Sequence, residues 1–272
     1  MNELGIERLC VFDLPPVEFV ELVADLGCPC IGIALTPMRH YNPHGYPDWS
    51  LRDDPRLRRE LVAAMRDRGV RISLLEGFGI APDKDVRAME SDLDVLVELG
   101  GERINLVSID RDWIRTLDGF AAVTAMAHER KIEVTTEVGA GFLRTLDAAV
   151  AAVREVASPN FRLLIDTMHY FRFGGTIAAL AALDPHLIGY VQLCDAPLVS
   201  PFASYMDEAL HERMVPGTGE LPLREFLALL RPDVVVSLEV PQRSLAQAGW
   251  STAERVGACV VGARALLTQA RA

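Results

Sequence analysis

Short apolar runs alternate with longer stretches of helical periodicity along the whole chain. The runs are rich in β-branched residues and lack a strict apolar–polar alternation, which predicts buried parallel strands rather than strands with one solvated face. Eight strands are predicted, at Leu9–Phe12, Cys30–Ala34, Arg71–Leu75, Ile104–Val107, Ile132–Thr136, Arg162–Ile165, Gly189–Leu193 and Val234–Leu238. Eight helices are predicted between and after them, at Pro16–Leu26, Pro55–Arg68, Lys84–Leu99, Asp112–Glu129, Leu146–Val156, Thr176–Leu183, Leu223–Leu230 and Thr252–Thr268.

This alternation predicts an α/β protein, a single (β/α)8 TIM barrel that takes residues 1–272 as one domain. The length of 272 residues is close to the roughly 250 that such a barrel needs. An open doubly wound sheet is the alternative. It is disfavoured because Asp13-Leu14-Pro15-Pro16 follows the first predicted strand, where a glycine-rich phosphate loop would be required.

Charge and cysteine content narrow the partners and the compartment. The net charge is −11 with no basic run, so we expect no nucleic-acid partner. No apolar stretch reaches the roughly 18 residues of a membrane span, and the N-terminal segment lacks the features of a secretory signal. The five cysteines are an odd number, and Cys28-Pro29-Cys30 lacks Cys-x-x-Cys spacing, so we expect reduced, buried thiols and a cytoplasmic protein.

Polar side chains follow four consecutive predicted strands, the fifth to the eighth. Glu137, Asp166, Gln192 and Glu239 each stand where such a strand ends. Functional groups of a (β/α)8 barrel project from these strand ends, so the four are expected to converge at one mouth. One such carboxylate is commonly a helix cap, but three converging carboxylates would repel each other unless a cation lay between them. The sequence therefore predicts a divalent-metal site, and its oxygen donors favour Mn²⁺ or Mg²⁺ over Zn²⁺.

Five short motifs in the second half of the chain carry a family resemblance: TTEVG, IDTMH, YVQLCD, PGTGE and SLEV. In this order the chain resembles the xylose isomerase-like barrel superfamily of sugar phosphate isomerases and epimerases. The resemblance implies that Glu137, Asp166, Gln192 and Glu239 bind one metal ion. It also implies a small sugar or keto acid substrate and a homo-oligomer, a dimer or a tetramer. The commonest family residue at the position of Gln192 is histidine. A glutamine there resembles the hydroxypyruvate isomerase and 3-dehydroshikimate dehydratase branches.

Further residues are candidates for substrate contact. The Asp-x-x-His spacing places His169 three residues after Asp166, and the resemblance implies that it faces the substrate. Arg213 resembles the substrate-binding arginine of the family, with a solvated loop charge as the alternative. Glu76 ends the third strand and is a candidate substrate-binding residue; Asn105, within the fourth, could also reach the pocket. Asp195 is expected to support this region rather than to bind the metal.

The loop Pro37–Ser50 is long and rich in aromatic residues, histidine and proline. Long loops at this face often close on a ligand, which predicts a lid whose candidate contacts are His40, His44, Tyr46 and Trp49. A self-packed surface loop is the alternative.

The leading functional prediction is a metal-dependent isomerase or epimerase that acts through an enediolate. The resemblance implies that Glu137 and Glu239 remove and return the proton while His169 and Arg213 hold the substrate oxygens. The runner-up is a metal-dependent dehydratase, a lyase acting on a cyclic keto acid such as 3-dehydroshikimate. An endonuclease IV-like DNA repair enzyme ranks third, because the chain has only six histidines and an acidic charge. A non-catalytic barrel, which would not be stabilised by metal, is the last alternative.

Overall fold

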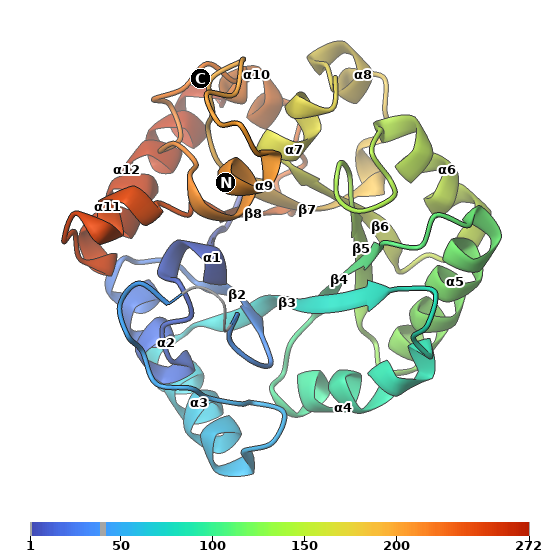
Figure 1. Ribbon diagram of the computed structural model, residues 1–272, viewed down its shortest axis with the longest axis horizontal. Helices are drawn as coiled ribbons and strands as arrows, with labels where there is room; N and C mark the ends of the chain where they lie inside the picture. The colour runs from blue at the N-terminus through green and yellow to red at the C-terminus, as the bar shows by residue number, and fades with distance from the viewer. Residues whose placement is uncertain (1, 39–41, 272) are drawn as a thin grey trace.

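Eight parallel strands form a closed barrel in the order β1 to β8, with helices around it (Figure 1). The structure, a computed structural model, describes residues 2–38 and 42–271. The strands are β1 (Leu4–Glu7), β2 (Cys30–Ala34), β3 (Arg71–Ile80), β4 (Arg103–Ser108), β5 (Glu133–Glu137), β6 (Phe161–Asp166), β7 (Ile188–Leu193) and β8 (Val235–Leu238). The predicted TIM barrel is therefore confirmed.

The helices that cover the barrel are amphipathic, and several begin or end at residues that commonly cap helices. The α-helices are α1 (Arg8–Val11), α2 (Pro16–Asp25), α3 (Pro55–Arg68), α4 (Glu90–Glu98), α5 (Trp113–Glu129), α6 (Leu146–Val156), α7 (Thr167–Arg172), α8 (Ile177–Ala181), α9 (Tyr205–His211), α10 (Leu223–Ala228), α11 (Arg243–Gln247) and α12 (Thr252–Gln269), with 3₁₀ turns at Val86–Met89 and Pro185–Leu187. Asp54 caps α3 ahead of a proline at its first position, and Gly69 ends it in the left-handed region. Ser251 and Glu254 form a capping box at α12.

The first strand differs from the prediction. Residues 9–12 were expected to be a strand, but β1 is Leu4–Glu7, and Arg8–Val11 form a helical turn that ends at Phe12 with a φ of 48°. The reason is Glu7, which is fully buried in the barrel, so a carboxyl group stands where the pattern requires an apolar residue. Gly32 on β2 makes room for it, because a Cβ there would lie 1.6 Å from Glu7 Oε2.

Four short helices were not predicted, because four to seven residues are too few to show a helical period: α1, α7, α9 and α11. They follow strands β1, β6, β7 and β8 and lie at the barrel mouth. The remaining elements start and end within a few residues of the predicted bounds, with two exceptions. Strand β3 runs on to Ile80, and the helix predicted at Lys84–Leu99 is a 3₁₀ turn at Val86–Met89 followed by α4.

The core has two parts. The larger apolar cluster packs between strands and helices, and a smaller one inside the barrel consists of Cys30, Leu74, Leu164, Tyr190 and Val235. Next to the inner cluster, the Tyr190 hydroxyl donates to Glu7 Oε1 at 2.8 Å and lies 2.9 Å from Ser73 Oγ. All five cysteines are buried and free, as predicted. Among the described residues, no helix has both the length and the apolarity needed to cross a bilayer.

Candidate active site

The four predicted metal ligands end four adjacent strands at the same mouth of the barrel. Glu137 and Asp166 are the last residues of β5 and β6, Gln192 is paired with Asp166 in the register of β7, and Glu239 follows β8. All four are buried, none more than 8% exposed. Parallel pairing therefore brings together residues that are more than a hundred positions apart in the chain.

Arg213 lies in the middle of this group. Its Nη1 is 2.5 Å from Asp166 Oδ2 and 2.9 Å from Glu239 Oε2, and its side chain is 1% exposed. Its backbone N–H donates to the Pro241 carbonyl at 2.8 Å, and its Nε donates to the Ala209 carbonyl at 3.0 Å. The sequence left open whether Arg213 is a solvated loop charge, and the structure shows that it is a buried partner of two carboxylates.

His169 lies three residues after Asp166, in α7, and the two oxygens of Asp166 have different partners. Asp166 Oδ1 accepts the His169 backbone N–H at 2.9 Å, which caps α7, while Oδ2 faces Arg213. His169 Nε2 lies 3.3 Å from Glu137 Oε1 and 3.3 Å from Arg213 Nη2. A guanidinium can only donate, so Nε2 accepts and the ring proton is assigned to Nδ1. Nδ1 is hydrogen-bonded to Tyr205 of α9, so the Tyr205 hydroxyl proton is free to point elsewhere.

Glu76 and Asn105 support the same cluster from β3 and β4. Gln192 Nε2 donates to Glu76 Oε1 at 3.0 Å and to Glu239 Oε1 at 3.2 Å. The other Glu76 oxygen accepts from Arg8 Nε at 2.8 Å. Asn105 Nδ2 donates to Glu137 Oε2 at 3.0 Å. Both predicted candidates therefore reach the pocket, and Glu76 orients Gln192.

The donor set fits a divalent cation. Within the described ranges, Glu137, Asp166 and His169 place ligand atoms within 4.8 Å of one another. Glu239 is not in that triad; Arg213 bridges it to Asp166. Two acceptors of the pocket, Gln192 Oε1 and Asn105 Oδ1, are buried with no hydrogen-bond partner among residues 2–38 and 42–271, a costly condition that a cation would relieve. Four carboxylates here face two guanidiniums, which leaves two negative charges to balance.

Burial and the neighbouring charges also shift the pKa values of the site residues. Burial, followed by repulsion from Asp166 and Glu76, raises the pKa of Glu137 to about 8. Burial also raises the pKa of Glu239 well above its ordinary value, although Arg213 opposes the shift. At Asp166 burial acts upward, but Arg213 and His169 outweigh it and lower the pKa. Burial lowers the pKa of His169 to about 4, so its imidazole is neutral at pH 7. Protons on two of the carboxyl groups would be exchanged for a bound cation.

Asp195 has the supporting role expected of it. Its Oδ2 accepts the backbone N–H groups of Gly217 and Gly219, both at 2.9 Å, and its Oδ1 accepts those of Ala196 and Leu221. One carboxylate thus fastens the PGTGE loop beside the site. A side chain at Gly219 would collide with it, since a Cβ there would lie 2.4 Å from Asp195 Oδ1.

Three of the four candidate lid residues pack against the scaffold. Tyr46 Oη is 3.0 Å from Thr252 Oγ1, His44 Nε2 is 3.0 Å from Arg255 Nη2, and Trp49 Nε1 donates to the Asp13 carbonyl at 3.1 Å. His40 lies outside the described residues. Closure of residues 37–50 over a substrate stays a prediction.

Comparison with known proteins agrees with the barrel fold. A model of the family described as "Xylose isomerase-like TIM barrel" matches residues 20–256. The chain belongs to this family. The resemblance inferred from the motifs is confirmed, and members of this family include isomerases, epimerases and dehydratases.

Two curated relatives are both named 3-dehydroshikimate dehydratase. The protein from Pseudomonas putida is 25% identical over 188 residues, which are 64% of this chain and 29% of the relative. The protein from Pseudomonas aeruginosa is 26% identical over 229 residues, 78% of this chain and 33% of the relative. The chain spans about a third of the length of these relatives.

Solved structures share the fold at lower identity. A crystal structure described as the IolI protein with a bound zinc atom has a TM-score of 0.78 at 17% identity and covers 98% of both chains. An L-ribulose 3-epimerase has a TM-score of 0.72 at 16% identity, covering 100% of this chain and 96% of its own. At these identities, the solved structures show that the barrel fold is shared.

Two residues of the site were missed in the sequence. Tyr205 lies on a short helix within the long segment after β7, and Arg8 lies directly before the strand predicted at Leu9–Phe12. Neither is part of a recognisable motif. The one available signal for Arg8 is its position directly after Glu7, where β1 ends at the mouth.

Proposed function

We propose that this protein is a divalent-metal-dependent dehydratase of a small cyclic keto acid of the 3-dehydroshikimate class. The strand-end motifs alone favour an isomerase. The observation that carries the dehydratase is the unequal setting of the two strand-end glutamates: Glu137 contacts His169, whereas Glu239 is bridged to Arg213. The names of the two relatives support the same reaction, and the glutamine at position 192 is compatible with it.

Elimination of water needs one group to take a proton beside the carbonyl and one to give a proton to the departing hydroxyl. Glu137, His169 and Tyr205 form a continuous path for this transfer. Glu137 takes the carbon-bound proton and passes it to His169 Nε2, whose Nδ1 proton moves to Tyr205 as the Tyr205 hydroxyl proton goes to the leaving group. The C–H electron pair forms the new double bond, the C–O bond breaks, and one proton enters for each proton that leaves.

The remaining residues hold and orient. Glu137, Asp166, Gln192 and Glu239, with His169 beside them, would hold Mn²⁺ or Mg²⁺. A bound divalent cation would polarise the substrate carbonyl and acidify the neighbouring C–H bond. Arg213 pairs with both Asp166 and Glu239, and Glu76 fixes the amide of Gln192.

The test is the conversion of 3-dehydroshikimate to its catechol product. The protein is treated with a chelator, reloaded with Mn²⁺, Mg²⁺ or Zn²⁺ and followed by catechol absorbance. We expect product only with metal, and a loss of turnover in Glu137→Gln. Metal-dependent turnover that is unchanged in both Glu137→Gln and Glu239→Gln would contradict the mechanism.

An isomerase or epimerase is the second candidate, favoured by one observation. Glu137 on β5 and Glu239 after β8 approach the site from different sides, with β6 and β7 between them, as a two-base reaction requires. This candidate predicts metal-dependent exchange of a ketose carbon-bound proton with D₂O and no catechol from 3-dehydroshikimate. If metal neither supports a reaction nor raises the Tm, the non-catalytic barrel is correct.

A further inference from the structure

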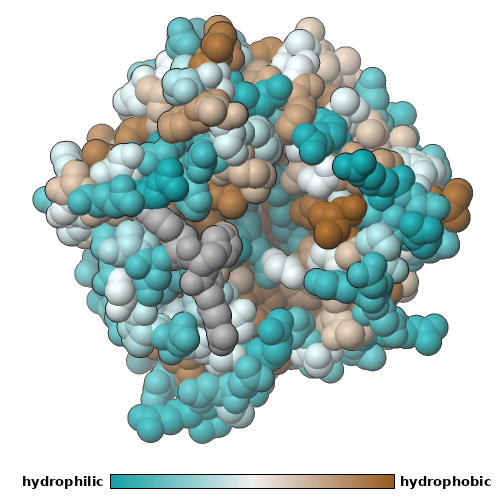
Figure 2. Space-filling view, viewed as in Figure 1, coloured by the Kyte–Doolittle hydropathy of each residue, from teal (hydrophilic) through white to brown (hydrophobic). Residues whose placement is uncertain are grey.

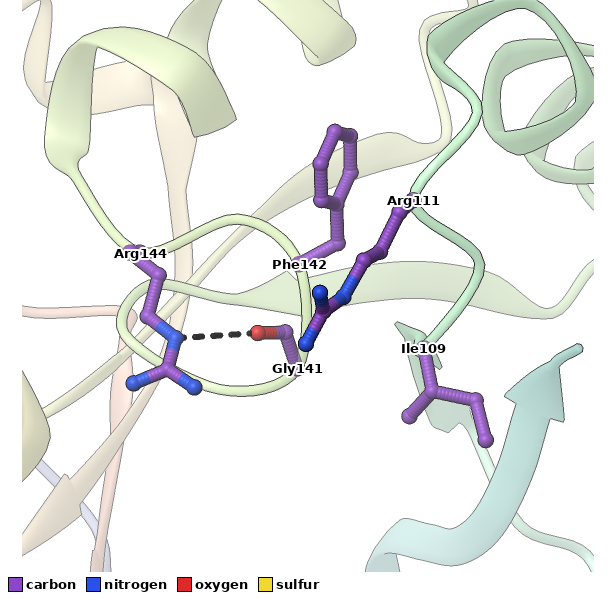
Figure 3. Close-up of a pocket in the computed structure, with 5 residues that line it drawn as sticks. All are labelled: Ile109, Arg111, Gly141, Phe142 and Arg144. Carbon is purple, nitrogen blue, oxygen red and sulfur yellow. Dashed lines mark hydrogen bonds between the residues drawn. The ribbon is translucent and has the colours of Figure 1, made fainter.

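A cavity of about 490 Å³ opens beside the candidate active site. It is lined by Ile109, Arg111, Gly141, Phe142 and Arg144. These residues come from the two loops that follow β4 and β5, so the cavity lies at the same mouth as Glu137. Figure 2 shows that this face is hollowed near its middle, and Figure 3 shows the lining residues.

Two arginines of the cavity are exposed and lack an acidic partner. Arg111 has no hydrogen bond or ion pair within the described part of the chain, and Arg144 has only the Gly141 carbonyl at 3.2 Å and the face of the Phe173 ring at 4.8 Å. Their guanidinium groups lie on either side of Gly141 (Figure 3). In a chain with a net charge of −11, two unpaired cations in one concave site are an unusual concentration of positive charge.

Residues of the cavity loops contact residues of the proton path. The loop that carries Arg144 starts directly after Glu137, and Gly139 packs on His169 so closely that a Cβ there would lie 2.9 Å from His169 Cβ. On the other side, Arg144 covers Phe173, whose ring centroid is 5.2 Å from that of Tyr205. A ligand in the cavity would therefore lie against groups that touch the reacting end of the site.

We infer that Arg111 and Arg144 form a subsite for the anionic group of the substrate, a carboxylate or a phosphate. Guanidinium groups present paired donors to planar or tetrahedral oxyanions, and such charge-assisted bonds are stronger than neutral ones. Ile109 and Phe142 give the same cavity an apolar wall for a carbon skeleton. Placing the subsite on the substrate rests on the proposed function, but anion binding can be measured without turnover.

The experiment measures binding of two probes, inorganic phosphate and benzoate, to the metal-loaded protein. Affinity is obtained from the rise in Tm with probe concentration. The variants are Arg111→Gln/Arg144→Gln and, as a matched control, Arg154→Gln. Arg154 is an exposed arginine on α6 that does not line the cavity. The control loses the same kind of charge from the same acidic protein.

We expect the double variant to bind the preferred probe at least about tenfold more weakly, and Arg154→Gln to stay within about twofold of the native protein. A preference for phosphate would indicate a phosphorylated substrate, and a preference for benzoate a carboxylic acid; either supports the subsite. Equal affinity in the native protein and the double variant, or no binding of either probe to the native protein, would overturn it. Weaker binding in the double variant together with inactivity on 3-dehydroshikimate would keep the subsite and reject the dehydratase.

Discussion

A cluster of buried carboxyl groups and one separate buried carboxyl group lie one layer apart in the same barrel. The mouth cluster consists of Glu137, Asp166 and Glu239, and Arg213 bridges the last two. Glu7 lies one layer deeper, fully buried, and its bonded partner is the hydroxyl of Tyr190. Both layers put acidic side chains where solvent cannot reach them, but they balance the charge differently.

The deeper layer balances its charge with a proton alone, whereas the mouth also has the guanidinium of Arg213 between two carboxyl groups. Burial, followed by repulsion from Glu76, raises the pKa of Glu7 to about 8, so its carboxyl group is neutral at pH 7. At the mouth, burial acts upward on the pKa of Asp166 but Arg213 outweighs it, and the buried amide oxygens of Gln192 and Asn105 have no hydrogen-bond partner among the described residues. A buried acidic residue is therefore not by itself a sign of function. Its neighbours decide whether it is structural or prepared for a ligand.

The largest contrast is expected between Glu137→Gln and Glu7→Gln, which replace a buried carboxyl group by an amide of the same shape. Glu137→Gln should lower kcat about 10²- to 10⁴-fold, because it removes the group that takes the proton. Glu7→Gln should leave kcat within about threefold. Steady-state kinetics on 3-dehydroshikimate measures both, and comparable losses in the two variants would erase the functional distinction between the layers.

Metal removal should affect the mouth alone. With Mn²⁺ at about 100 times its Kd, binding should stabilise the native protein by about 2.7 kcal/mol, seen as a higher Tm than in the chelated protein. Asp166→Asn should lose most of this gain while still capping α7, since asparagine is a good cap. Glu7→Gln should keep the full gain. Retention of the gain in Asp166→Asn would place the ion elsewhere.

The deeper layer should be visible in the pH dependence of stability. Between pH 4.5 and about 8 the folded protein keeps a proton on Glu7 that the unfolded chain has released. The stabilisation is therefore complete below pH 4.5 and is lost as the pH rises through 8. Relative to Glu7→Gln, the native protein should lose about 4 kcal/mol of unfolding free energy between pH 5 and pH 9, as measured by urea denaturation. Parallel curves for the two proteins would show that Glu7 is ionised when folded.

A pair of tyrosines gives the smallest expected effect. Tyr205→Phe should lower kcat about tenfold with little change in Tm, since it removes one proton donor from the path and leaves the ring in place. Tyr190→Phe removes the hydroxyl that bonds Glu7, so it should lower Tm and leave kcat within about twofold. The reverse outcome would assign the Tyr205 hydroxyl to structure.

The fold was predictable because seven of the eight strands contain a short run rich in apolar and β-branched residues. The exception, β1, carries Glu7 into the interior, and no pattern of apolar residues can announce a buried carboxyl group whose partner lies 183 positions away. The strand-end residues Glu137, Asp166 and Gln192 were predictable for the opposite reason, since each is polar at the end of such a run. Whether they bind a metal together is still a prediction.

The contacts of the site were less predictable than its members. Arg213 was a candidate on motif alone, but its position between two carboxylates depends on how the segment after α9 pairs with β7 and with the end of β8. Tyr205 was missed because its seven-residue helix is set by tertiary packing and has no sequence period. Both depend on long-range contacts, which a single sequence does not encode locally.

Substitution of Asp166 is strongly constrained in any redesign of this barrel. One of its oxygens fastens the helix that carries His169, and the other faces Arg213. A longer glutamate would carry the carboxylate one bond too far to serve both, and alanine would release helix and arginine together. Helix capping and the pairing with Arg213 cannot be changed separately at this position. New substrate preferences are therefore more readily engineered in the neighbouring loops.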